Sequence, residues 1–274
     1  MVSSKPKVLA LVPARGGSKS IPRKNLKTLG GCPLLAYSIA AGLQAASVDR
    51  VIVSTDDAEI AAVARQWGAE VPFLRPAQLA RDDTPDFPVI VHALRWLQKR
   101  EKYHADVIVQ LRPTSPLRPP GGVDDGVALL LGNPAADSVR AVKPAGENPY
   151  KMWRLEQGWL VPLLETGLPE AYNMPRQKLP PTYWQTGHLD VIRVTSLKHK
   201  HSLTGDRVLP LLVDPRYAID LDQPEQWPLV EWLLAHLPLP LVRPCAGGTH
   251  GGVGRHARHP LTPQQVPVQP QEEA

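Results

Sequence analysis

At 274 residues and a formal net charge of +5, the chain is long enough for one α/β domain of about 200–250 residues and a tail. No apolar run approaches the roughly 20 residues of a membrane-spanning helix, and the short apolar segment 8–14 runs straight into a basic loop, unlike a signal peptide. Cys32 and Cys245 lack metal-ligand or paired-thiol spacing, which fits a reducing compartment. We therefore expect a cytoplasmic protein with no membrane partner.

The positive charge is concentrated in a loop that follows the first predicted strand, residues 7–12. The cations of this loop are Arg15, Lys19, Arg23 and Lys24. Adjacent glycines at 16 and 17 let backbone N–H groups face a ligand, and the cations would neutralise several negative charges at once. Ligands of α/β sheets bind at the carboxyl ends of the strands. A small polyanion is therefore favoured over a solvated basic loop, and over nucleic acid, for which the chain has no recognisable motif.

Strands and helices alternate along the rest of the chain. Helices are expected at 33–46, 58–67, 87–100, 121–132 and 225–237. Strands are expected at 50–56, 71–74, 106–111, 138–143, 183–193, 208–213 and 216–219. This alternation predicts a Rossmann-like, doubly wound, mostly parallel sheet.

Two stretches depart from the alternation. Residues 144–181 contain prolines and tryptophans without a helical period, and we expect an irregular or β-ribbon excursion there. Residues 238–274 are rich in Pro, Gly, His and Gln and have little to bury, which predicts a disordered tail. The folded domain would then cover residues 1–237.

Asp220 and Asp222 are candidate metal ligands. Their alternation along an extended segment would place both carboxylates on one face. Mg²⁺ is usually bound by one or two carboxylates together with phosphate oxygens and water. The alternative is that Asp222 caps the next helix and Asp220 is a turn residue. Neither a Walker motif nor a dinucleotide fingerprint follows the first strand, which argues against a kinase and against a dehydrogenase.

Several separated motifs together point to one family. They are PARGGSK at 13–19, PRKN at 22–25, VSTD at 53–56, RPAQLA at 75–80, PTSPLR at 113–118, RQ at 176–177, LP at 179–180 and IDLD at 219–222. In this order and spacing, over residues 7–237, the chain resembles the acylneuraminate cytidylyltransferases, also called CMP-sialic acid synthetases. The resemblance implies a nucleotidyltransferase-type fold that dimerises through the excursion 144–181.

The resemblance also implies an activity and its residues. Such enzymes use CTP and Mg²⁺ to place CMP on the anomeric hydroxyl of an acidic nine-carbon keto sugar, releasing pyrophosphate. Catalysis would rest on Lys24 and Arg15. The nucleotide would be bound by Arg15, Gly16, Lys24, Asn25, Arg75 and Thr114. The sugar would be bound by Arg112, Lys151, Arg176 and Gln177, and Mg²⁺ by Asp220 and Asp222.

Three positions depart from the family pattern. Arg112 replaces a glutamine that faces the sugar, Asp86 replaces a hydroxyl residue near the cytosine, and Thr186 replaces an asparagine before Gly187. Arg112 can form a bidentate pair with a carboxylate, so it could bind the carboxylate of the sugar or exclude an acetamido group. Asp86 and Arg112 could also compensate one another electrostatically.

The sequence leaves the substrate open. A sialic, legionaminic, pseudaminic or deaminated nonulosonic acid fits the pattern. The eight-carbon 3-deoxy-octulosonate is second, because the PTSP turn resembles the nine-carbon branch. A nucleotide-binding protein without catalysis is a further alternative, against which Lys24 and both aspartates argue.

Overall fold

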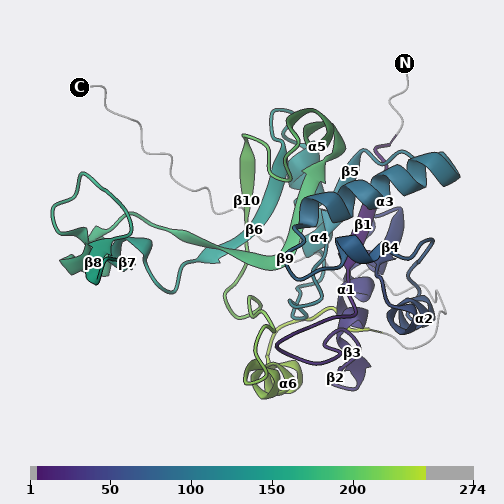
Figure 1. Cartoon of the computed structure of the whole chain (residues 1–274), viewed down its shortest axis with the longest axis horizontal. Coiled ribbons are helices and arrows are strands. Elements are labelled where there is room, and N and C mark those ends of the chain that lie inside the picture. The colour runs from purple at the N-terminus through teal and green to yellow at the C-terminus, as the bar shows by residue number, and fades with distance from the viewer. Residues whose placement is uncertain (1–4, 245–274) are drawn as a thin grey trace.

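The computed structural model describes residues 5–244, and a six-stranded sheet lies at the centre of this part (Figure 1). The sheet has the order β10-β6-β9-β5-β1-β4. Its strands are β1 (Val8–Pro13), β4 (Arg50–Ser54), β5 (Val107–Gln110), β6 (Ser138–Pro144), β9 (Tyr183–Arg193) and β10 (Val208–Leu212). β9 runs antiparallel to β5 and β6, and all other neighbours are parallel. The prediction of a mostly parallel, doubly wound sheet is confirmed.

Six α-helices lie in the described part of the chain. They are α1 (Leu34–Leu43), α2 (Ala58–Gln66), α3 (Asp86–Glu101), α4 (Gly122–Leu131), α5 (Val194–Lys200) and α6 (Gln226–His236). Five of them, α1 to α5, pack on this sheet. Apolar residues of β1 alternate between the faces: Val8, Ala10 and Val12 pack in the core with α1, α2 and α4. Leu9 and Leu11 pack on the other side with α3 and α5. The continuous apolar run of β1 is thus explained by burial on both faces.

A third apolar cluster lies apart from these two and connects distant parts of the chain. It joins Ile21 of the basic loop, Leu117 of the proline-framed turn (the PTSPLR motif, 113–118), Leu221, and Trp227 and Val230 of α6. The cluster brings three segments that are far apart in sequence to the same end of the sheet.

None of the helices in the described residues is long and apolar enough to cross a membrane.

Several predicted elements are wrong. Residues 71–74 form no strand, since Pro72 cannot donate to a ladder, and one bridge between Glu70 and Ile52 is the nearest pairing. Residues 216–219 form no strand either: a turn covers residues 215–217, closed by the Tyr217 N–H on the Asp214 carbonyl at 3.0 Å, and residues 218 and 219 are irregular. Three elements were missed: α5 and the short pair β2 (Thr28–Leu29) and β3 (Cys32–Pro33). Runs of two residues carry no period, and α5 follows β9 without a break.

The expected excursion contains a hairpin that projects away from the sheet (Figure 1). It consists of β7 (Trp153–Glu156) and β8 (Trp159–Pro162). Single turns of 3₁₀-helix lie at Ala77–Leu79, Pro149–Lys151, Ala171–Asn173 and Arg176–Lys178.

The tail was expected to begin at residue 238. However, Val242 is buried, and its N–H donates to the Arg118 carbonyl at 2.8 Å. The domain therefore reaches at least Val242, and the rest of the expected tail, 245–274, lies outside the described residues.

Candidate nucleotide and sugar site

The basic loop after β1 is held in shape by its own side chains. The Asn25 amide donates to the Arg15 carbonyl at 2.9 Å, and the Gly16 N–H donates to Asp56 Oδ1 at 3.0 Å. A Cβ at Gly16 would lie 2.8 Å from Asp57 Oδ2, so only glycine fits beside the start of α2. Asn25, which is predicted to contact the nucleotide, therefore also stabilises the conformation of the loop.

Three of the loop cations form ion pairs at the surface. Arg15 and Lys19 both contact Asp82, at 2.8 and 2.7 Å, and Arg23 contacts Asp57 at 2.5 Å. Lys19 and then Arg15 hold the pKa of the Asp82 carboxyl below its usual value. Exposed pairs of this kind contribute little to stability. Their cations can therefore exchange a carboxylate for a phosphate.

Lys24 differs from these cations because its side chain is only 14% exposed. Its ammonium donates to the Leu221 carbonyl at 3.0 Å and lies 3.5 Å from Asp222 Oδ1. The Leu221 N–H in turn donates to the Thr114 carbonyl at 2.7 Å. The structure thus brings the basic loop, the turn at Thr114 and the two candidate metal ligands into direct contact.

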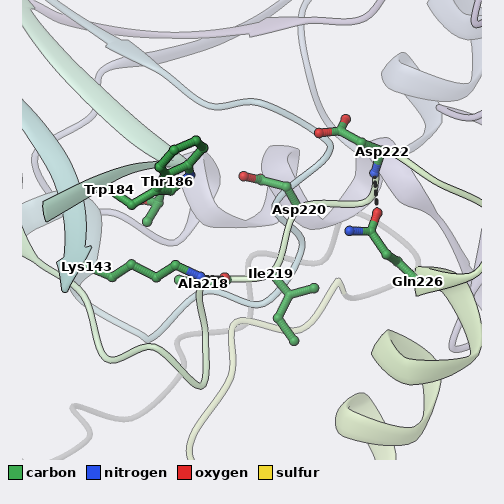
Figure 2. A pocket seen from close by; sticks show the side chains of 8 residues that line it. All are labelled: Lys143, Trp184, Thr186, Ala218, Ile219, Asp220, Asp222 and Gln226. Carbon is green, nitrogen blue, oxygen red and sulfur yellow. Dashed lines mark hydrogen bonds between the residues drawn. The ribbon is translucent and has the colours of Figure 1, made fainter. Parts of the chain in front are cut away.

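The segment that carries Asp220 and Asp222 is an irregular connection that pairs with no strand. Both residues line one cavity of about 340 Å³ (Figure 2). The other residues of its lining are Lys143, Trp184, Thr186, Ala218, Ile219 and Gln226. The Ser115 hydroxyl donates to Asp220 Oδ1. A Cβ at Gly187 would lie 2.6 Å from that same carboxylate oxygen. Gly187 therefore permits the close approach of β9 to Asp220.

The alternative role of Asp222 as a helix cap is not supported. Helix α6 begins at Gln226, and no side chain caps its first turn. Instead Gln226 Oε1 accepts from the backbone N–H groups of Asp222 and Gln223, at 2.7 and 2.8 Å. The Asp222 carboxylate is two-thirds exposed and open to a ligand. The described residues contain no cluster of three or more His, Cys, Asp or Glu that could hold a metal. Two hard carboxylate oxygen donors completed by phosphate oxygens fit Mg²⁺.

Arg112, two residues after the end of β5, lies in a network of charges that reaches β6, β9 and the start of α3. Its guanidinium donates to Asp190 at 2.8 Å and to Asp86 at 2.7 Å, and Arg140 also donates to Asp190 at 2.8 Å. The Asp190 side chain is only 2% exposed. Burial alone would lower the pKa of Arg112, but the two aspartates raise it above its usual value. The predicted compensation between Asp86 and Arg112 is confirmed, and the charge of Arg112 is already balanced by carboxylates.

The other predicted site residues occupy two different places. Arg75 is buried and donates to the backbone carbonyls of Ser54 and Leu79, at 2.9 and 3.2 Å, so it braces the end of β4. Lys151 donates to the Tyr172 carbonyl at 3.2 Å, and Arg176 to the Ala145 carbonyl at 2.6 Å. These two and Gln177 lie in the excursion, and none of them lines the cavity.

Two residues that support the site, Arg118 and His188, were not predicted. Arg118 is buried and donates to the carbonyls of His188 and Arg112 and to the Ser38 hydroxyl. His188 Nε2 lies 2.8 Å from the Leu117 carbonyl oxygen. Together they fix the proline-framed turn to β9. Arg118 is the last residue of the PTSPLR motif at 113–118 but was given no role, and His188 lies in the predicted strand 183–193 with no motif of its own.

We expect His188 to make stability depend on pH. Burial, and to a lesser extent the charge of Arg118, lowers the pKa of its imidazole from 6.5 to about 4. Between these values the unfolded chain binds the proton and the folded chain does not. Stability therefore falls as the pH drops through this window and levels off below it, with a loss of about 3 kcal/mol from this group.

The measurement is urea unfolding of the wild type and of His188→Gln at pH 7 and pH 4.5. Glutamine keeps a donor for the Leu117 carbonyl but does not titrate. The variant should lose less stability than the wild type on acidification. An equal loss in both proteins would contradict the assignment.

The comparisons with known proteins agree with this geometry. The sequence profile of the family described as Cytidylyltransferase matches residues 9–155. The chain is 34% identical over 231 residues to the CMP-N,N'-diacetyllegionaminic acid synthase of Legionella pneumophila, covering 83% of this chain and 96% of that protein. It is 31% identical over 224 residues to N-acylneuraminate cytidylyltransferase A of Danio rerio, covering 82% of this chain and 50% of that protein.

Solved structures show the same fold. A CMP:2-keto-3-deoxy-manno-octonic acid synthetase complexed with CTP superposes with a TM-score of 0.61 at 17% identity, covering 84% of this chain and 98% of that one. A 4-diphosphocytidyl-2C-methyl-D-erythritol synthase gives a TM-score of 0.59 at 16% identity, covering 85% and 100%. At such low identity these likenesses concern the fold alone.

Proposed function

Since the chain belongs to the cytidylyltransferase family and is a nucleotidyltransferase, we propose that it transfers CMP from CTP to the anomeric hydroxyl of a nonulosonic acid. The sugar oxygen would form a bond to the α-phosphorus, the bond to pyrophosphate would break, and the hydroxyl proton would pass to solvent. The observation that carries the proposal is the contact of Lys24 with the segment of Asp220 and Asp222. It joins the loop that we propose binds the phosphates to the two side chains that we propose bind the metal.

The nucleotide half of the site is assigned to the loop after β1. Transfer of a nucleotidyl group depends on in-line positioning and on neutralisation of phosphate charge. Arg15 would exchange Asp82 for a phosphate oxygen, and Lys24, held at the Leu221 carbonyl, would stabilise the charge that develops on the phosphates. Gly16 and Asn25 fix the loop backbone around them.

Asp220 and Asp222 would hold Mg²⁺, whose chemistry when bound is to neutralise phosphate oxygens and orient the triphosphate. The donor set fits, because both carboxylates line the same cavity and Asp222 is exposed. The Ser115 hydroxyl would orient Asp220 by donating to one of its oxygens. The second oxygen would remain for the metal.

Gly187→Ala should lower kcat/KM by roughly tenfold to a hundredfold. The new methyl group would meet Asp220 and the Ser115 hydroxyl, and these side-chain ends would have to move. Because Ser115 is fully buried, the clash should also lower the melting temperature, which is measured alongside the kinetics. Gly146→Ala is the matched control, since no atom lies within 4 Å of its added Cβ. Equal kcat/KM values in the two variants would show that catalysis does not depend on the position of the Asp220 carboxylate.

The sugar is a nonulosonic acid in this proposal, supported by the relative named for N,N'-diacetyllegionaminic acid. The experiment is to incubate the protein with CTP, Mg²⁺ and one of four acids, and to measure pyrophosphate. The acids are N-acetylneuraminic, N,N'-diacetyllegionaminic and pseudaminic acid and 3-deoxy-octulosonate. Release with a nine-carbon acid supports the proposal, and release only with the octulosonate selects the second candidate. CTP binding without release would mean a nucleotide-binding protein without catalysis.

We also propose that the protein is a homodimer formed through the excursion. The β7–β8 hairpin carries apolar side chains that are largely exposed, with Trp159 77% and Leu155 73% accessible. An exposed apolar patch of this kind favours a protein partner. Light scattering should give a dimer for the wild type and a monomer for Trp159→Glu. A wild-type monomer at micromolar concentration would contradict the proposal.

A further inference from the structure

We infer that Lys143 binds the carboxylate of the acidic sugar and so selects for acids. This inference rests on the proposed function and names a residue for its acceptor half. Lys143 lies near the end of β6 and lines the cavity together with Asp220 and Asp222 (Figure 2). Among the described residues that line this cavity, it is the one with a cationic side chain.

The ammonium of Lys143 is held in place but has donors to spare. It donates to the Ala218 carbonyl at 2.9 Å, from an aliphatic stem that is partly buried. An ammonium has three N–H donors and no acceptor, so two remain for a ligand. Lys143 is paired across the sheet with Trp184, whose exposed ring lines the same cavity. A polar donor beside an aromatic face is suited to bind a sugar that carries a carboxylate.

The charges in the cavity make such a cation necessary. Asp220 and Asp222 both lie in its lining, and an anionic sugar would be repelled by them. Even when a metal screens these two carboxylates, the acid of the sugar still loses part of its hydration shell on entry. A charge-assisted hydrogen bond from Lys143 would compensate for that loss.

The other cations near the site are already engaged. Arg112 and Arg140 share Asp190, and Arg112 also contacts Asp86, so this network is neutral. Lys24 is held by the Leu221 carbonyl and Asp222. The two excursion cations, Lys151 and Arg176, do not line the cavity of this chain. Lys143 therefore remains as the cation best placed for a carboxylate inside it.

The test compares an acid with its neutral ester. Wild type, Lys143→Met and Lys143→Arg are titrated by calorimetry with N-acetylneuraminic acid and with its methyl ester, in the presence of Mg²⁺ and a non-hydrolysable CTP analogue. N,N'-diacetyllegionaminic acid and its ester are used if the panel above selects them. Methionine keeps the length of the side chain and removes its charge. Lys99→Met removes an exposed charge from α3 and serves as the matched control.

The wild type should prefer the acid over the ester by roughly tenfold to a hundredfold, as for a hydrogen bond to a charged group. Lys143→Met should lose this preference, Lys143→Arg should restore part of it, and Lys99→Met should keep it. Affinity for the CTP analogue should stay within about threefold of the wild type in all variants.

Two outcomes would overturn the inference. One is an acid preference in Lys143→Met equal to that of the wild type. The other is a parallel loss of CTP, acid and ester affinity, which indicates that Lys143 only ties β6 to the segment before Asp220. Both are distinguishable from failure of the proposed function, because that failure would appear as absent pyrophosphate release in a wild type that still binds the acid.

Discussion

Lys24→Ala is expected to lower kcat by at least about a hundredfold, the effect of removing one donor that stabilises developing charge. Its side chain is largely buried, and its ammonium connects the loop after β1 with the segment of Asp220 and Asp222. The fold should persist, because the loss of one hydrogen bond to the Leu221 carbonyl costs about 1 kcal/mol. Turnover at saturating substrate and the urea midpoint measure the two effects separately.

Lys27→Ala is the control for this variant. Lys27 belongs to the same basic segment, but its ammonium lies over the Trp227 ring, 4.4 Å from its centroid. It should therefore retain near-normal kcat and lose at most a little stability. Unchanged turnover in Lys24→Ala, or an equal loss in both variants, would remove Lys24 from the catalytic site.

Asp222→Asn should raise the Mg²⁺ concentration needed for half-maximal turnover by at least about tenfold, since a neutral amide is a weaker ligand for a hard cation than a carboxylate. The variant should keep its fold, because the Asp222 side chain is exposed and it is the backbone N–H that contacts Gln226. The measurement is a Mg²⁺ titration at fixed CTP and sugar.

Asp214→Asn is the control for the metal titration. Asp214 lies in the preceding loop and pairs with Arg216, and neither residue lines the cavity. Its Mg²⁺ requirement should match that of the wild type. An unaltered titration in Asp222→Asn would contradict the metal assignment and leave Asp222 as a residue that only contacts Lys24.

The sheet could be predicted from the sequence because β-branched runs and helical periods identify which segments are buried. The apolar run of β1 and the basic loop behind it are local features, and both are where the pattern placed them. The contact of Lys24 with Leu221 joins residues 197 positions apart, and only the family resemblance assigned Lys24 and the aspartates beside Leu221 to one site. Periodicity does not encode contacts of this range.

Register is the main feature that the sequence left open. Pairing of β6 with β9 shifts between Arg140 and Val142, and this irregularity falls opposite the Thr186–Gly187 stretch. The shift brings Gly187 against Asp220, and it orients Thr186 so that its hydroxyl donates to the Ala141 carbonyl at 3.1 Å. The predicted departure at Thr186 therefore concerns a side chain that is tied to the backbone, although it lines the cavity.

The departures at Asp86 and Arg112 have a common explanation. Each would place an unbalanced charge beside the site, and together with Asp190 and Arg140 they form a closed network. Removing one member of this partly buried pair would leave the other charge without its partner, so these residues are expected to change together. This is why Arg112 is a weaker candidate for the sugar carboxylate than the sequence suggested, and why Lys143 takes that role in our proposal.

The most direct test of the account is to identify the product formed from CTP and a nonulosonic acid with Mg²⁺, by mass spectrometry together with ³¹P NMR. The account predicts one CMP-linked sugar for each pyrophosphate released, with the phosphodiester at the anomeric carbon. Hydrolysis of CTP without a CMP-sugar, or no reaction with any acid of the panel, would contradict it.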